Sequence, residues 1–175
     1  MIQQGLGVSP GIVSGKAYLL DRKQIEINTY TLKESQIATE ISRFHQALAI
    51  SKDQLSQLKI KLAESLGSEH LYIIDTHLML LDDDMLVSDT VKGISENKIN
   101  AEWALKRALE NFVSIFESMN DEYLKERRTD VLQVGNRVLY NLIGKRIDSF
   151  SQLDRPVILV AHDLAPSDTL QMNKE

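Results

Sequence analysis

Apolar residues follow a helical spacing through much of the first half of the chain. Between Ile37 and Leu62 they recur at steps of three, four and seven residues, which predicts one stripe on a helix of about eight turns. The stripe consists of Ile37, Ile41, Phe44, Leu48, Leu55, Leu58 and Leu62. Thr31 and Glu34 have the spacing of a capping box, and Gly67 can end the helix. A long amphipathic helix is therefore expected between these residues.

Three further helices are expected after this one. The second begins after Ser68 and has an apolar face formed by Leu71, Ile74, Leu78 and Leu81. Three other apolar residues lie off that face, namely Tyr72, Met79 and Leu80. Asn100 can cap the third helix, and the fourth begins at Asp121 and closes at Gly144. Because the connections are short, the helices are expected to form an antiparallel bundle.

Strand-like sequence lies only before and after the helical region. Apolar runs at Gly15–Leu20 and Val157–Val160 predict two short strands. The expected fold class is mainly α, with a helical bundle at residues 25–145 inserted into an incomplete α/β domain at residues 1–24 and 146–175. The end segments make too small a core for an α/β domain, because pieces below about 40 residues rarely fold unaided. Either they lean on the bundle, or the chain is cut short.

Composition narrows the classes of function. Twenty basic and twenty-five acidic residues give a net charge of -5, which argues against a general nucleic-acid binder and favours a basic partner. The chain has no cysteine, so disulfides, thiolate nucleophiles and cysteine-based zinc sites are excluded. No apolar run is long enough to span a membrane, and the N-terminus lacks the layout of a signal peptide. A cytoplasmic location is expected.

The histidines and the acidic run do not form a metal site by spacing. His70 and His77 would lie roughly 10 Å apart along one helix, too far to bind one ion, so they are interpreted as surface or interface side chains. His45 lies beside the apolar stripe and is interpreted as structural. The run Asp82–Asp84 lacks the glycine and distal glutamate of an EF-hand loop. No metal ligands are therefore expected in this chain.

The stretch from Glu69 to Leu86 has the composition of a protein-binding surface. Four carboxylates, Glu69, Asp75, Asp83 and Asp84, accompany the surplus apolar residues of the second helix. An apolar patch edged by acid suits a basic protein partner. The alternative at this stage is a purely structural helical module that self-associates through the stripe from Ile37 to Leu62.

Four sequence motifs, taken together, resemble those of one family. They are "SPGIVSGKA" at Ser9–Ala17, "THLMLLDDD" at Thr76–Asp84, "DEYLKERRTDV" at Asp121–Val131 and "VILVAHDLAPSDT" at Val157–Thr169. In order and spacing they resemble the N-terminal half of enzyme I, the phosphoenolpyruvate-protein phosphotransferase family of the bacterial sugar phosphotransferase system. The resemblance covers essentially the whole chain.

The resemblance implies an α/β swivelling phosphohistidine domain split by a helical domain that docks the phosphocarrier HPr. Residues that match the family's docking face are Glu69, Tyr72, Met79, Leu80, Asp83, Asp84, Leu86, Leu124 and Arg127. Thr169 matches a hydroxyl that supports the family's phosphohistidine. Three positions depart from the family pattern, namely Ser68, Met85 and Ala165. These departures leave open the nitrogen-related branch of the family, and the pyruvate phosphate dikinase relatives also stay open.

The resemblance also implies which parts of the activity this chain lacks. The family's phosphorylated histidine lies in a Gly-Gly-x-x-Ser-His motif expected shortly after Glu175, and none of the four histidines has that context. Phosphoenolpyruvate, magnesium and homodimer contacts belong to a C-terminal domain in this family. The chain is therefore expected to bind the carrier without catalysing phosphoryl transfer, and no cofactor is expected in it.

Overall fold

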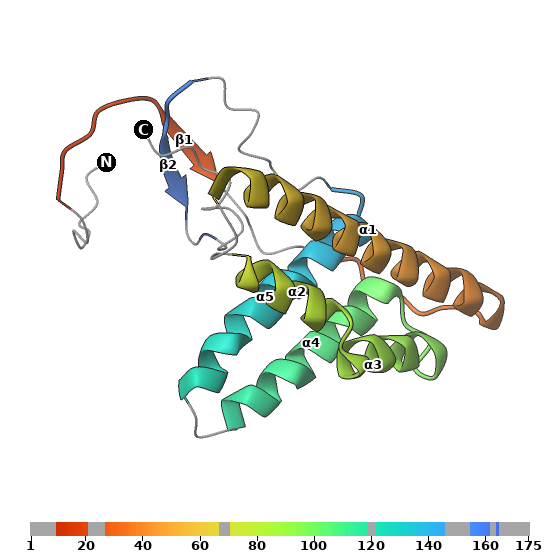
Figure 1. The fold of residues 1–175 in the computed structure, drawn as a ribbon. Helices are drawn as coiled ribbons and strands as arrows, with labels where there is room; N and C mark the ends of the chain where they lie inside the picture. Colours follow the sequence, from red (N-terminus) through yellow and green to blue (C-terminus); the bar gives the residue numbers. More distant parts are fainter. Residues whose placement is uncertain are drawn as a thin grey trace.

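A computed structural model describes residues 10–20, 27–66, 71–118, 122–145, 155–161 and 164. The elements occur in the order β1, α1, α2, α3, α4, α5, β2 (Figure 1). Their bounds are β1 Ala17–Leu20, α1 Glu34–Leu66, α2 Tyr72–Leu81, α3 Asp84–Ser95, α4 Ala101–Ser118, α5 Glu122–Leu142 and β2 Ile158–Ala161. The chain is mainly helical, as the sequence predicted.

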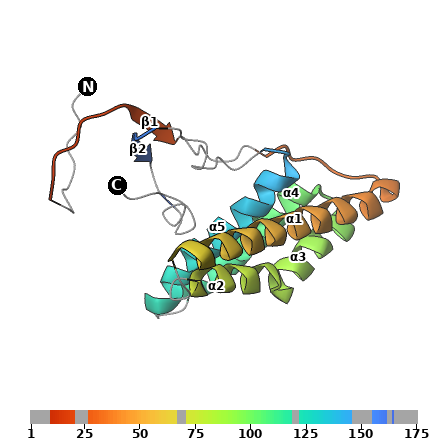
Figure 2. The same ribbon diagram turned by 45° about the horizontal axis from the view of Figure 1, so that its top comes forward.

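The helices pack into one bundle around a continuous apolar core. Helix α1 contacts α2, α3, α4 and α5, and α4 runs antiparallel to α5 (Figures 1 and 2). The predicted stripe of α1 enters this core: Phe44 and Leu55 are fully buried, and Ile37, Ile41 and Leu58 are partly buried against it. Burial of the stripe holds the long helix in the bundle, because tertiary packing of an apolar face supplies most helical stability.

The start of α1 differs from the predicted capping box. Thr31 forms an isolated antiparallel bridge with Ile99, so its backbone is extended and the helix begins at Glu34. The backbone N–H of Lys33 donates to Oε1 of Gln36 at 2.8 Å. Gln36 therefore plays the part predicted for Glu34, whose carboxylate lies 2.7 Å from Nζ of Lys98. The Thr31–Glu34 box was wrong because tertiary pairing moved the helix start.

Helix α3 was not predicted. Four helices were expected, and the structure adds the twelve residues from Asp84 to Ser95. The chain turns at Asp82 and Asp83, and the Asp83 side chain accepts a hydrogen bond of 2.8 Å from the backbone N–H of Met85. An aspartate in the N-cap position satisfies one of the free donors at a helix start. The acidic run is thus a helix boundary.

The end of α5 matches the prediction at Gly144. Gly144 has a φ of 67°, a left-handed conformation that costs glycine little. The N–H of Lys145 donates to the carbonyl of Tyr140 at 3.0 Å, and that of Gly144 donates to Asn141 at 3.3 Å. This pair of bonds is a Schellman motif, which satisfies the last carbonyls of the helix.

The two predicted strands form one parallel pair. Leu19 lies opposite Val160 in the register, and the N–H of Ile158 donates to the carbonyl of Lys16 at 2.8 Å. In both ribbon views the pair lies outside the helical bundle (Figures 1 and 2). Segments from opposite ends of the sequence therefore meet, which agrees with the expected insertion. The boundaries 1–24, 25–145 and 146–175 stay a prediction.

Candidate docking surface on α2 and α3

Helix α2 exposes two large apolar side chains. Tyr72 is 66% exposed and Met79 is 74% exposed. Thr76 lies between them at helical spacing, so all three share one stripe of the helix surface. The opposite side of α2 enters the core through Ile74 and Leu81. Leu80 is half-buried and packs against the core, so it contributes only an edge to the exposed stripe.

The acidic residues at the junction of α2 and α3 have different roles. Asp82 pairs with Lys52 of α1, and Asp83 caps α3. Asp84 is exposed in the first turn of α3, and no ion-pair partner is seen for it among the residues that the structure describes. Met85 is also exposed and extends the apolar stripe onto α3, a contribution that sequence reasoning missed. Of these three acids, Asp84 is therefore the exposed one that neither caps a helix nor pairs with a described lysine.

Ion pairs and a buried imidazole attach α2 to its neighbours. Asp75 pairs with Lys59 of α1, so the two α1–α2 pairs hold α2 antiparallel to α1. His77 is only 2% exposed, and its Nε2 lies 3.5 Å from a carboxylate oxygen of Asp130 on α5. His77 was interpreted as a surface or interface side chain, but it is buried, because its face of α2 packs toward α5. These contacts fix the orientation of the exposed stripe.

One predicted docking residue lies inside the bundle. Leu86 is 2% exposed and belongs to the apolar core, so it cannot present its side chain to a partner in this structure. The prediction for Leu86 is corrected: it follows the inward period of α3, along with Thr90 and Ile94.

Other predicted positions are not described. Glu69, His70 and Thr169 lie outside the described residues. Leu124 and Arg127 are on α5, but their side chains also lie outside the described part. The candidate surface defined by the structure therefore consists of Tyr72, Thr76, Met79, Leu80, Asp83, Asp84 and Met85, and is called the α2–α3 face.

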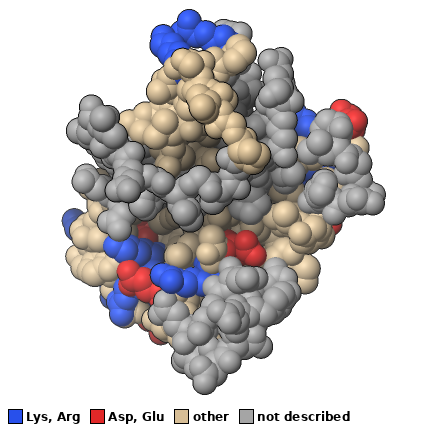
Figure 3. Space-filling view, turned by 90° about the vertical axis from the view of Figure 1, so that its left-hand side faces the viewer, with Lys and Arg blue, Asp and Glu red and all other residues tan. Residues whose placement is uncertain are grey.

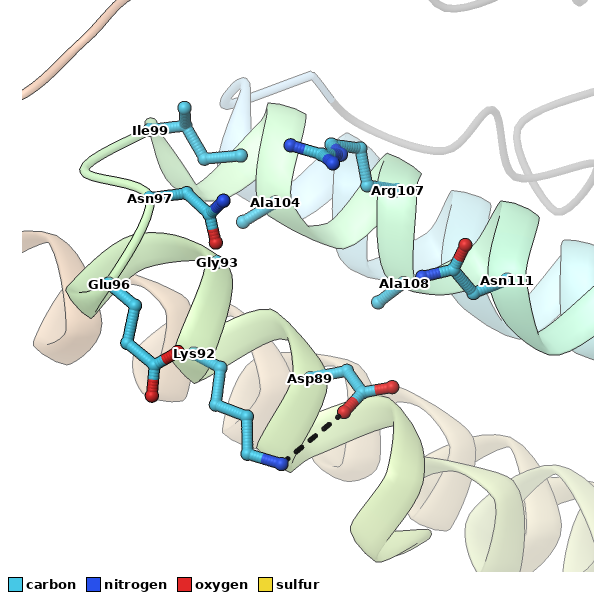
Figure 4. Close-up of a pocket in the computed structure, with 10 residues that line it drawn as sticks. All are labelled: Asp89, Lys92, Gly93, Glu96, Asn97, Ile99, Ala104, Arg107, Ala108 and Asn111. Atoms are coloured by element: carbon cyan, nitrogen blue, oxygen red, sulfur yellow. Dashed lines mark ion pairs between the residues drawn. The ribbon is translucent and has the colours of Figure 1, made fainter.

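A surface pocket lies on another side of α3. It has a volume of about 270 Å³ and lies between α3 and α4 (Figure 4). Its narrow floor reflects close packing, since a Cβ added to Gly93 would lie 3.0 Å from Cβ of Ala104. Lys92 pairs with Asp89 at 3.8 Å, and Arg107 lies across from Glu96 and Asn97 on the rim (Figure 4). The mixed charges favour no particular class of ligand.

A partly buried charged network lies nearer the N-terminal end of α1. Arg43 binds Glu40 of its own helix through Nε and Nη2, at 3.1 and 2.6 Å. It binds Glu102 at the start of α4 through Nη1 and Nη2, at 2.8 and 2.6 Å. Nη1 also donates to the carbonyl of Leu142, the last residue of α5, at 3.0 Å. These five bonds match the five N–H donors of a guanidinium group.

Electrostatics strengthen this network. Hydrogen bonding to Glu102, and then to Glu40, raises the pKa of Arg43 above its usual value. Burial alone would raise the pKa of Glu102, but its hydrogen bonds, above all the one from Arg43, outweigh burial and lower it. Sequence reasoning missed these residues, because Glu40 and Arg43 read as an ordinary pair on a helix surface.

Charge on the side of the molecule nearest the strand pair is mixed. Figure 3 shows basic and acidic side chains next to one another over its lower half. Within the described ranges, no group of three or more histidine, aspartate or glutamate residues could hold a metal ion. No helix among the described residues is long and apolar enough to cross a membrane.

The similarity of the chain to known proteins identifies its family. Residues 4–127 match the family described as "PEP-utilising enzyme, N-terminal". The chain therefore belongs to the N-terminal family of enzymes that use phosphoenolpyruvate. Its relatives include the phosphoenolpyruvate-protein phosphotransferases of Bacillus subtilis (strain 168), 40% identical, and of Haemophilus influenzae (strain ATCC 51907 / DSM 11121 / KW20 / Rd), 36% identical. Each similarity covers 98% of this chain and 30% of the relative.

Two solved structures share the fold. An Enzyme I protein (nEIt) determined by NMR in solution is 37% identical, with a TM-score of 0.78 over 90% of this chain and 64% of that chain. The N-terminal domain of the nitrogen Enzyme 1 is 24% identical, with a TM-score of 0.66 over 91% of this chain and 65% of that one. The resemblance to the N-terminal region of enzyme I is therefore confirmed, and the chain spans about 30% of the length of its curated relatives.

Proposed function

We propose that this chain is the carrier-docking part of a phosphoenolpyruvate-protein phosphotransferase, and that its α2–α3 face binds HPr or an HPr-like phosphocarrier. The observation that carries the proposal is the exposure of Tyr72 and Met79 beside the exposed carboxylate of Asp84. Methionine and tyrosine supply contact area that desolvates well, and a carboxylate at the edge attracts a basic partner. The family relationship supplies the kind of partner.

Binding variants test this surface. Tyr72→Ala and Met79→Ala should each weaken binding of labelled HPr from Bacillus subtilis about tenfold, because buried contact at an interface centre carries most of the affinity. Asp84→Lys should mainly slow association, with a smaller effect at high salt, since edge charges act on encounter. The measurement is a titration together with stopped-flow kinetics.

A matched control is available on another helix. Ile60 is an exposed aliphatic side chain of α1 that is not part of the α2–α3 face, so Ile60→Ala should leave binding unchanged. Equal losses for Ile60→Ala and Met79→Ala would contradict docking on this face. Folded protein with no HPr binding at low salt would overturn the proposed partner.

The competing proposal, a self-associating structural module, needs an interface that is buried in this structure. It required an available stripe from Ile37 to Leu62, and Phe44 and Leu55 on that stripe are fully buried inside the bundle. Sedimentation at several concentrations separates the two proposals: the docking function predicts a monomer for this chain. The choice between a sugar-related, a nitrogen-related and a dikinase-like parent stays open, and binding of different carriers would decide it.

The remaining parts of the activity are proposed from the family relationship. In a whole enzyme of this type, phosphoenolpyruvate would phosphorylate a histidine, with Thr169 beside it, and the carrier would accept the group. We expect this chain alone to be inactive in transfer, since none of its four histidines stands in the Gly-Gly-x-x-Ser-His context. By the family relationship, magnesium and homodimer contacts would belong to the C-terminal domain of such an enzyme. A cytoplasmic location fits this role.

A further inference from the structure

The network around Arg43 joins the two places where the chain enters and leaves the helical bundle. The exit is the end of α5, whose Leu142 carbonyl accepts from Arg43. The entry is the segment before α1, where Nδ2 of Asn100 donates to the carbonyl of Asn28 at 2.8 Å. The backbone N–H of Tyr30 donates to Oδ1 of Asn100 at 3.1 Å. Asn100 was predicted to cap α4, but its side chain binds the entry segment instead.

Glu102 connects the entry side of this network to Arg43. Nδ2 of Asn100 also donates to Oε2 of Glu102 at 2.7 Å, and Glu102 binds Arg43. Glu40 completes the group, because its Oε1 accepts from the backbone N–H of Ala101 at 2.7 Å and so caps the start of α4. A continuous chain of hydrogen bonds thus runs from the entry segment to the end of α5.

We propose that Arg43 is a positioning residue that couples the entry and exit of the bundle, so that both connections to the strand pair leave from one rigid base. Its five donors serve three segments that are far apart in the sequence, and the acceptors are two buried carboxylates and one helix-terminal carbonyl. A lysine has only three donors and no planar fork, so it cannot maintain this arrangement. The base then sets the orientation of the bundle relative to β1 and β2.

The coupling has a functional consequence, which rests on the proposed docking function. A carrier bound to the α2–α3 face moves with the bundle, so a rigid base presents it to the strand pair in a restricted orientation. The coupling itself does not depend on docking. Arg43 and the α2–α3 face share no residue, so carrier affinity is a separate measurement.

Hydrogen exchange of this chain tests the coupling from both ends. In Arg43→Lys, exchange should accelerate about tenfold or more at the entry amides of Tyr30 and Leu32 and at the exit amides of Ile143 and Lys145. Asn100→Asp alters the contacts with Asn28 and Glu102 but touches no exit residue directly, yet it should also accelerate exchange at Ile143 and Lys145. Lys59→Met, which removes a single exposed ion pair, is the control and should leave these amides unchanged.

Distance measurements test the orientation. Because the chain has no cysteine, spin labels can be attached at only two introduced sites, Lys16→Cys beside β1 and Ser88→Cys on α3. The distance distribution should be narrow with Arg43 present and broader with Arg43→Lys, while HPr affinity is unchanged. Unchanged exchange at the exit in both variants, or equal widths of the two distributions, would overturn the proposal. Loss of HPr affinity in Arg43→Lys would also overturn it, because Arg43 would then act on the docking face itself.

Discussion

At the scale of single residues, neighbours in the sequence have different roles. Asp83 and Asp84 are adjacent acids, and a composition argument treats them alike. In the structure, Asp83 uses its carboxylate to cap α3, whereas Asp84 is exposed one residue later. The difference arises because only the residue with an extended backbone at a helix start can accept from the following N–H groups. Asp84 is thus the better test of charge in docking.

Glu102 should make the stability of the bundle depend on pH. Its folded pKa lies below the usual 4.5, so folding favours its charged form. The contribution is present above the unfolded pKa and is lost as the pH falls through the folded value. Urea unfolding at pH 7 and pH 4 should therefore show a larger loss of free energy for the native sequence than for Glu102→Gln. Glu110→Gln, an exposed change on the same helix, should lose as much as the native sequence.

At the scale of elements, α4 and α5 approach closely where Gly135 faces Leu109. A Cβ at Gly135 would lie 2.3 Å from Cδ1 of Leu109 and 2.9 Å from its Cγ. Leu109 is buried, so its side chain has little room to move away. Glycine destabilises a helix interior, but it is needed here because any larger residue would collide with Leu109.

Gly135→Ala should destabilise the chain by about 1–3 kcal/mol, the usual cost of overpacking a core. Urea unfolding measures the change in free energy. The double variant Gly135→Ala with Leu109→Ala should be more stable than the sum of the two single changes predicts, because the smaller residue relieves the clash. Additive effects would contradict the close approach as the cause.

At the scale of the whole molecule, the bundle and the strand pair differ in how well they are supported. The bundle has a continuous core and a network that closes its two ends, while the strand pair has two strands and leaves Leu19 and Val160 exposed. A two-stranded sheet is marginal on its own, and parallel strands are normally covered on both faces. Among the described residues, the bundle therefore supplies most of the stability.

Residues 25–145 should fold when separated from both end segments. The expected result is a cooperative urea transition of the helical circular dichroism signal, with a midpoint close to that of the whole chain. A non-cooperative or absent transition would contradict the predicted domain boundaries. Limited proteolysis of the whole chain should cut the end segments before the bundle, for the same reason.

Much of the fold could be predicted from local patterns. The stripe of α1, the Gly144 cap and the two strands were visible because each depends on neighbours a few residues away. The start of α1 could not be predicted, since Thr31 pairs with Ile99. For the candidate site, the off-stripe position of Tyr72 and Met79 predicted their exposure, whereas the burial of Leu86 depended on the unpredicted α3.

The sequence by itself determined the helical class, the family and the composition of the docking stretch, because periodicity and motifs are written in residue order. Only the tertiary structure decided which carboxylates are exposed to a partner and which already bind a lysine or arginine of the chain. Asp75 and Asp82 pair with lysines of α1. Arg43 binds Glu102, which lies 59 residues away, as well as Glu40 on its own helix. Such pairings depend on how helices pack, and the spacing of residues along one helix carries no record of a partner on another.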